Sequence, residues 1–226
     1  MRITALLLLI LTGCSINTVG QSFVGTKYMN SPLGEGIAPD ADPLIRFDAF
    51  DCTTFVETVL ANGEEKKLNK IRYQDGKIDF LNRNHFIESD WLVNNSDIVH
   101  NVSNKFAQTK VRTVTIDKQN WFKTVHNIST DFAPETIHLE YIPYQNIKKI
   151  NNDTPLIVLF ISDNPKIHDK IGTDLAVVHM GFLLPDGTLR HASSEQNMVI
   201  DVDFYDYIRD RQKTKHNIGI TLVAIK

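Results

Sequence analysis

Residues 176–192 read AVVHMGFLLPDGTLRHA and predict two neighbouring β-strands joined by a tight turn. The two apolar runs flank Pro185-Asp186-Gly187, three residues that favour turns for distinct backbone reasons. Three other segments of the last third also have the composition of strands: residues 155–161, 199–202 and 218–225. The C-terminal third therefore predicts an antiparallel sheet.

Residues 50–61 (FDCTTFVETVLA) predict a helix upstream of that sheet. Asp51 is a good candidate for its N-cap, and Thr54 with Glu57 has the spacing of a capping box if the helix begins later. A helix followed by an antiparallel sheet indicates the α+β fold class. The apolar residues that recur at helical spacing are Phe55, Val56, Val59 and Leu60.

The middle of the chain, residues 64–150, has weaker patterns. Residues 64–72 are helical in character, and a further short helix is expected near residues 90–92. Residues 111–116 alternate as a strand does, and residues 136–143 are expected to be extended.

The composition is that of an ordinary globular protein of one domain. The chain has 226 residues, is 42% apolar and has a formal net charge of −3. No basic block is present, which argues against a nucleic-acid partner. The two cysteines, Cys14 and Cys52, are the most informative feature of the composition.

The first cysteine follows a short secretory signal. Arg2 precedes an apolar run over residues 3–11, which is too short to span a bilayer as a permanent helix. The run ends in LTGC at residues 11–14, which resembles the bacterial lipobox and implies a lipid-modified Cys14. An uncleaved membrane anchor is the alternative reading of this segment.

The chain thus divides into a lipoprotein signal peptide at residues 1–14, a tether at residues 15–22 and a catalytic domain at residues 23–226. Ser15, rather than an aspartate, follows the cysteine. The resemblance to lipoproteins therefore favours the periplasmic face of the outer membrane, with attachment through the lipid on Cys14.

Cys52 has no other cysteine to pair with once Cys14 is acylated. Such a thiol is either buried and inert or retained for its reactivity. Cys52 lies at the predicted start of a helix, where unpaired backbone N–H groups and the helix dipole favour a thiolate. The same N–H groups can stabilise an oxyanion, so this position favours a nucleophile.

A thiol nucleophile needs a base and a group that orients the base. His179 lies inside an apolar strand, and His191 lies on the next strand, so the two imidazoles can meet side by side. His191 would then fix the tautomer of His179, although two structural core histidines would give the same pattern. The remaining histidines are expected at the surface: His85, His100, His126, His138, His168 and His216.

Several segments in order resemble the NlpC/P60 superfamily of papain-like cell-wall hydrolases, in the N-acetylmuramoyl-L-alanine amidase-like branch (DUF1460). The resemblance extends from about Thr26 to the end of the chain. The segments that carry it are FDCTTFVE at 50–57, IRYQDGKID at 71–79, SDW at 89–91, VHMGF at 178–182 and LRHASS at 189–194.

The resemblance implies a Cys52, His179, His191 triad on a papain-like fold, in which the helix bearing the nucleophile packs on an antiparallel sheet and the middle segment is an insertion. It also implies that Tyr28 helps to bind the oxyanion or substrate and that Asp51 shapes the turn before the nucleophile. The implied substrate is peptidoglycan, and no cofactor or metal is implied.

Other functions remain open at the level of sequence. The bond cleaved is either that between muramic acid and L-alanine or one within the stem peptide. A zinc amidase is disfavoured because no HExxH motif is present, whereas a thiol acyltransferase would use the same triad. A non-catalytic module that binds cell-wall fragments would lack fast alkylation of Cys52 by iodoacetamide, which a hydrolase is expected to show.

Overall fold

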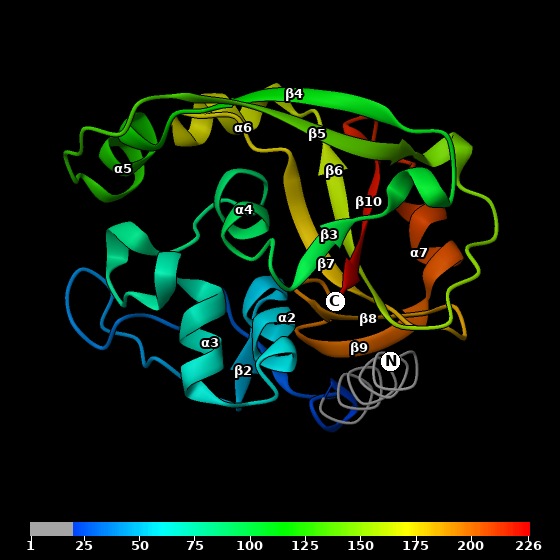
Figure 1. The fold of residues 1–226 in the computed structure, drawn as a ribbon, viewed down its shortest axis with the longest axis horizontal. Coiled ribbons are helices and arrows are strands. Elements are labelled where there is room, and N and C mark those ends of the chain that lie inside the picture. The colour runs from blue at the N-terminus through cyan, green and yellow to red at the C-terminus, as the bar shows by residue number, and fades with distance from the viewer. Residues whose placement is uncertain (1–19) are drawn as a thin grey trace, which may run out of the picture.

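The computed structural model describes residues 20–226 as one large sheet with helices on both faces (Figure 1), which confirms the α+β class. The strand order is β2-β1-β9-β8-β7-β6-β10-β5-β4, and β3 pairs with β10. All pairs are antiparallel except β1 with β2. The strands are β1 Lys27–Tyr28, β2 Ala49–Phe50, β3 Val99–Asn101, β4 Lys110–Ile116, β5 Glu135–Pro143, β6 Leu156–Ser162, β7 Val177–Leu183, β8 Thr188–Ser193, β9 Met198–Asp203 and β10 Asn217–Ile225.

The helices include two that the sequence predicts, α2 and α3, and three that the sequence analysis did not identify, α5, α6 and α7. A π-helical turn, η3, stands where a short helix is expected near residues 90–92, and it runs into α4. The helices are α2 Cys52–Leu60, α3 Glu65–Arg72, η1 Gln74–Gly76, η2 Phe80–Asn82, η3 Ile87–Trp91, α4 Leu92–Asn94, η4 Ser103–Lys105, α5 Lys118–His126, η5 Tyr144–Asn146, α6 Pro165–Ile171 and α7 Phe204–Arg211.

The sheet has a hydrophobic core on each face because every residue of β6 is buried. Alternate side chains of a strand point to opposite faces. On one face Ile157 packs in a cluster with Phe55 of α2. On the other face Phe160 packs in a second cluster with Phe204 of α7. Helices α2 and α7 therefore cover opposite faces of the same strands.

The middle segment contributes the edge of the sheet as well as helices beside α2. The predicted strands near residues 111–116 and 136–143 form β4 and β5, which pair with each other throughout β4. Figure 1 shows these two strands along the top of the molecule, with α5 beyond their end. Over residues 20–226, no helix has the length and apolar character needed to cross a bilayer.

The start of the described chain overlaps the predicted tether. Residues 20–22 are helical, and the side chain of Gln21 accepts a hydrogen bond from Arg190. This part of the predicted tether therefore packs against the domain. Residues 1–19, with the predicted signal peptide and Cys14, lie outside the described residues.

Candidate active site

Cys52 is the first residue of α2, and the residues before it fix the helix start. Asp51 is the N-cap, as the sequence predicts, because its carboxylate accepts from the Thr54 backbone N–H at 2.7 Å. The capping box pairs Asp51 with Thr54, whose Oγ1 accepts from the Asp51 N–H at 3.0 Å. The alternative capping box between Thr54 and Glu57 requires a helix that begins after Thr54. It does not form, because the helix begins at Cys52. Ser31 N–H donates to the same carboxylate at 3.1 Å and ties the preceding loop to this turn.

Tyr28, to which the resemblance assigns a role in binding the oxyanion or substrate, lies near Cys52. β1 pairs in parallel with β2, which sets Tyr28 level with Phe50. Burial, together with the nearby Cys52 and Asp51, raises the pKa of Tyr28 to about 12. The phenol is therefore protonated at neutral pH and available as a hydrogen-bond donor.

The two predicted histidines meet because Gly181 leaves space between them. Phe182 of β7 pairs with Arg190 of β8, and extending the register by one residue sets Gly181 opposite His191. A Cβ on Gly181 would lie 2.8 Å from the Cβ of His191. His191 fills this space and reaches diagonally across the strands. His179 Nε2 lies 2.7 Å from His191 Nδ1.

The backbone of β7 contacts the thiol where β7 and β8 separate. The Leu184 N–H donates to Thr188 of β8 at 2.8 Å. Because alternate residues direct their N–H groups to the same neighbouring strand, the Met180 N–H points the same way. No β7–β8 pair forms at Met180 among the described residues, and its N–H bonds the sulfur of Cys52, lowering the pKa of the thiol. Cys52 is thereby held against the residue that follows His179.

The imidazole contact assigns the roles of the ring nitrogens. An imidazolium carries a proton on both nitrogens, so a protonated His179 must donate from Nε2 to His191 Nδ1. His179 Nδ1 is then the nitrogen left to exchange a proton with a neighbouring group. His191 carries its own proton on Nε2, an atom that is buried without a hydrogen-bond partner among the described residues.

The resting site is electrically neutral, contrary to the expectation of a thiolate. Burial, together with the nearby carboxylate of Asp51, raises the pKa of Cys52 to about 12. Burial lowers the pKa of His179 well below 6.5 and that of His191 to about 4. The N–H groups of the helix start and of Met180 favour the thiolate, but the loss of solvation outweighs them.

Helix α7 supplies two functional candidates that the sequence analysis missed. The ring of Tyr207 stacks edge-on to His191 with centroids 4.9 Å apart. The guanidinium of Arg211 lies 5.6 Å from the ring centre of Phe160, which in turn lies 5.5 Å from the ring of His179. The positive charge of Arg211 lowers the pKa of both histidines.

The other histidines lie away from this pair. His85 is not the surface residue that the sequence suggests. It is half-buried in an aromatic cluster, packs on Trp121 at 4.8 Å between ring centroids, and contacts the Phe80 carbonyl through Nε2 at 2.7 Å. Burial lowers the pKa of His85 to about 3. His216 is also half-buried; the exposed ones are His100, His126, His138 and His168.

A cavity of about 220 Å³ lies on the opposite side of α2, between α2 and α3. Asp51 and Thr53, the two neighbours of the nucleophile, form part of its wall. Arg72 and Asn84 of the middle segment form another part, together with Glu57 of α2. In residues 20–226, no cluster of three or more histidine, cysteine or acidic side chains is arranged to hold a metal ion.

The family model described as AmiA-like, N-acetylmuramoyl-L-alanine amidase-like, matches residues 18–218. The chain belongs to this family. Its fold is similar to that of a Legionella pneumophila protein of family DUF1460, with a TM-score of 0.86, 24% identity and coverage of 95% of this chain and 89% of that one. An N-acetylmuramoyl-L-alanine amidase from Bacteroides uniformis is similar with a TM-score of 0.72, 21% identity and coverage of 96% and 99%.

At these identities the likeness to solved structures shows a shared fold. No curated protein matches the chain. For this member of the AmiA-like family, the matched range includes Cys52, His179 and His191.

Proposed function

We propose that this AmiA-like chain is a cysteine-dependent N-acetylmuramoyl-L-alanine amidase with the papain-like architecture of NlpC/P60 enzymes. The family description supports peptidoglycan fragments as the substrate. The observation that carries the proposal is the 2.7 Å contact between His179 and His191 at the strand residue adjoining Cys52. A nucleophile, a base and a group that orients the base are thus available in one place.

The mechanism begins from the neutral pair. His179 Nδ1 takes the thiol proton as Cys52 Sγ attacks the amide carbonyl, and the imidazolium is stabilised by donating from Nε2 to His191 Nδ1. The tetrahedral intermediate collapses with cleavage of the C–N bond, and His179 returns the proton to the leaving amine. Water then attacks the thioester, with His179 as its base, and releases the carboxylic acid and the thiol.

The oxyanion is stabilised by donors at the helix start. The Cys52 N–H belongs to the first turn of α2, whose N–H groups have no partner within the helix. The protonated hydroxyl of Tyr28 supplies a second donor from β1. Asp51 contributes indirectly, since its carboxylate is occupied with the backbone of Ser31 and Thr54 and so holds the turn in place.

Digestion of purified muropeptides by the domain from Gly20 onward, with Cys52→Ala as the matched control, tests the proposal. Mass spectrometry of the products should show intact stem peptide released by the wild type alone. Cleavage within the stem would instead identify an endopeptidase that uses the same triad. Absence of turnover by a folded wild-type sample would favour a module that only binds cell-wall fragments.

Rapid alkylation of the resting thiol is not part of this proposal. Because burial raises the pKa of Cys52 to about 12, iodoacetamide should label the free enzyme slowly at pH 7. Slow labelling of an enzyme that turns over muropeptides is therefore the expected combination, and it indicates that substrate binding precedes thiolate formation.

We further propose that the chain is exported and anchored by a lipid on Cys14 at the periplasmic face of the outer membrane. The LTGC sequence at residues 11–14 supports this proposal. Metabolic labelling with palmitate should mark the wild type and not Cys14→Ser, and membrane fractionation should then locate the labelled protein. A wild type that is exported without label would contradict the anchor.

A further inference from the structure

The strand that carries the proposed base is irregular immediately before that residue. Phe160 of β6 pairs with His179, whereas the next residue of β6 pairs with Val177. Val178 is therefore an extra residue on β7, which makes this point a β-bulge. A bulge interrupts the alternation of side chains, so the residues that follow it change face.

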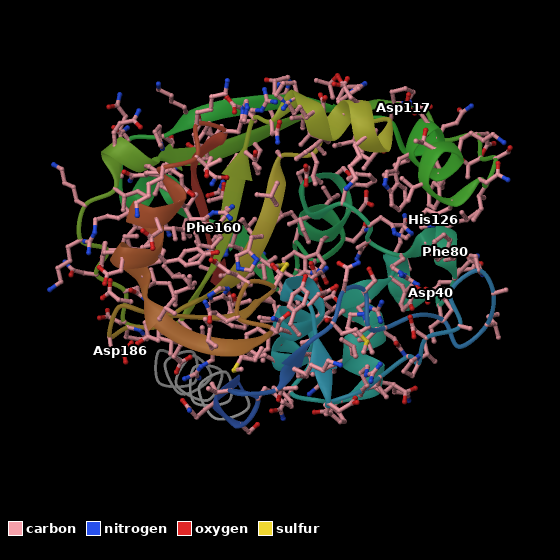
Figure 2. The ribbon with its side chains drawn as sticks, turned by 180° about the vertical axis from the view of Figure 1, so that it is seen from behind. Asp40, Phe80, Asp117, His126, Phe160 and Asp186 are labelled. Carbon is pink, nitrogen blue, oxygen red and sulfur yellow. The ribbon has the colours of Figure 1, made fainter. Side chains whose placement is uncertain are left out.

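The bulge decides on which face of the sheet the imidazole of His179 lies. In a regular strand, residues two apart face the same side. Val177 packs in the cluster that includes α2, but His179 contacts Phe160, which lies on the α7 side of β6 (Figure 2). His179 thereby reaches the face on which it meets His191. Without the bulge, the imidazole would point to the α2 side of the sheet.

The carboxyl group of Glu88 binds the backbone at the start of this bulge. Its Oε1 accepts from the Ala176 N–H at 2.5 Å and from the Val177 N–H at 3.4 Å. Glu88 is only 3% exposed, and a buried backbone N–H needs an acceptor. The two N–H groups come directly before the extra residue of β7, so the place of this oxygen fixes where the bulge forms.

Glu88 acts here as a hydrogen-bond acceptor rather than as a charge. Its Oε2 has no hydrogen-bond partner in the described part of the chain. Burial raises the pKa of Glu88 to about 7, against the opposite effect of the N–H groups that it binds. Near neutral pH both protonation states are therefore populated, and each keeps an oxygen that can accept from the backbone. An amide side chain would keep that oxygen as well.

Glu88 belongs to the π-helical turn η3, which is itself closed by side chains. The Phe86 carbonyl accepts from the N–H groups of both Asp90 and Trp91 at 3.0 Å. Asp90 reaches back to the start of the turn, since its Oδ2 accepts from the Phe86 N–H at 3.2 Å, and its Oδ1 accepts from Ser89 Oγ at 2.8 Å. Such turns are rare and frequently occur at functional sites. Ser89, Asp90 and Trp91, a segment that has no part in the proposed chemistry, thus hold Glu88 in place.

We infer that Glu88 is a positioning residue for the base: its carboxyl oxygen fixes the bulge of β7 and so directs the imidazole of His179 toward His191. The inference rests on the proposed function, to which it adds a residue outside the triad. The middle segment thus acts on the reaction through the backbone of β7.

Two substitutions separate the place of the oxygen from its charge. Glu88→Gln keeps an oxygen at the same distance from the backbone, whereas Glu88→Asp keeps the carboxyl group and withdraws it by one methylene. Glu88→Asp should lower kcat on muropeptides by about 10²-fold, the scale of a misplaced catalytic group, with little change in KM. Glu88→Gln should stay within about threefold of the wild type, because a neutral amide oxygen also satisfies the backbone.

Full activity of Glu88→Asp would overturn the inference, and so would a loss in Glu88→Gln as large as that in Glu88→Asp. Glu88→Met, which removes both oxygens at a similar volume, takes the place of Glu88→Asp if that variant does not fold.

Ser103→Ala is the matched control, since it removes another buried acceptor of the same sheet. Ser103 is fully buried, and its Oγ accepts from the Leu222 N–H of β10 at 2.9 Å. Strand β10 is separated from β7 by β6. Ser103→Ala should lower the midpoint of chemical denaturation and leave kcat unchanged. An equal loss of kcat in Ser103→Ala and Glu88→Asp would show a general effect of destabilisation and would overturn the positioning role.

The imidazole of His179 provides a readout that needs no turnover. In the wild type, its Nε2–H should be hydrogen-bonded to His191 Nδ1, and proton–nitrogen correlation NMR of the imidazoles should show this resonance. In folded Glu88→Asp the resonance should shift or disappear, and in Ser103→Ala it should stay in place. An unchanged resonance in folded Glu88→Asp would overturn the inference. A wild type that shows the resonance but cleaves no muropeptide would overturn the amidase proposal alone.

Discussion

The two flanks of α2 are built on different principles. On the sheet flank, the side chains of His179 and His191 are set by strand register and a missing Cβ at Gly181. On the α3 flank, the cavity is assembled from the loop before α2, from α2 itself and from the middle segment. The first flank is thus fixed by the pairing of neighbouring strands, and the second by segments that are distant in the sequence.

The two flanks of α2 also differ in their charged groups. Within residues 20–226 no carboxylate bonds to the histidine pair, and burial together with the charge of Arg211 lowers the pKa of both imidazoles, which are therefore neutral at pH 7. In the cavity Arg83 is paired with Glu35 and Asp40, and Arg72 lies 3.5 Å from Glu57, whose pKa burial raises to about 7.

Loss of the base should have the largest effect. His179→Gln should lower kcat/KM on muropeptides by about 10²–10⁴-fold, because glutamine cannot act as the base that takes the thiol proton. His138→Gln is the control, since His138 is an exposed histidine on β5. Equal losses in both variants, or wild-type turnover by His179→Gln with a normal melting curve, would contradict the role of the sheet flank.

Gly181→Ala tests whether the missing Cβ sets the geometry. The added methyl group would lie 2.8 Å from both the His191 Cβ and the Arg190 carbonyl oxygen, so β8 must shift. We expect about 1–3 kcal/mol of destabilisation in chemical denaturation and a loss of activity of about 10²-fold from the displaced imidazole.

The matched control is Gly20→Ala, whose added Cβ meets Arg190 Cδ at 3.5 Å, an ordinary contact. Gly20→Ala should change neither the stability in chemical denaturation nor the activity by a measurable amount. A fully active Gly181→Ala would show that the imidazole pair tolerates a shift of β8. It would contradict the proposal that the missing Cβ at Gly181 sets the geometry of the pair.

Arg211→Met tests the charge on the sheet flank. Arg211 lowers the pKa of His179 and His191, so its removal should raise both. Because His179 must be neutral to accept the proton, the acid limb of the kcat/KM profile should then move to higher pH. Arg209→Met, an exposed position on the same helix, should leave the profile in place, and Arg211→Lys should restore it in part. A shift of the acid limb to lower pH would contradict the proposal that Arg211 lowers the pKa of the two histidines.

Asp51→Asn should have the smallest effect. The amide keeps an oxygen for the N-cap but removes the negative charge that raises the pKa of Cys52. The pKa of the thiol should therefore fall, and alkylation by iodoacetamide at pH 8 should become faster. Asp51→Ala should instead cost about 1 kcal/mol of stability by loss of the cap. The control Asp48→Asn, exposed and paired with Arg46, should alkylate at the wild-type rate.

The sheet flank was largely predictable because its signals are local. Strands β6 to β10 and helix α2 follow from apolar periodicity and turn residues, and a nucleophile at a helix start with histidines on adjacent strands is visible in the linear pattern. Tyr28 and Asp51 were also identified, through the family resemblance. In the structure His179 contacts His191, and Tyr28 and Asp51 lie near Cys52; their roles in catalysis stay predictions.

Helix α7 was missed even though local signals were present. Asp203 caps it by accepting from the Asp206 N–H, and Phe204 with Ile208 forms a buried i, i+4 pair. The segment is short and strongly charged, so its sequence is compatible with a solvated loop as well as with an amphipathic helix. Tyr207 and Arg211 lie on the same face of the helix as this pair, but nothing in the sequence marks their closeness to the histidines.

The sequence by itself determined the fold class, the helix that begins at Cys52, and the histidines of two neighbouring strands, because these depend on contacts within a few residues. The tertiary structure alone decided the protonation of the site, the approach of Arg211 and the closing of the cavity by Arg72. These depend on burial and on charges brought together from distant segments. Desolvation is a property of the packed fold, so even a residue type identified correctly in the sequence, such as Cys52, differs in its resting charge from what its local position favours.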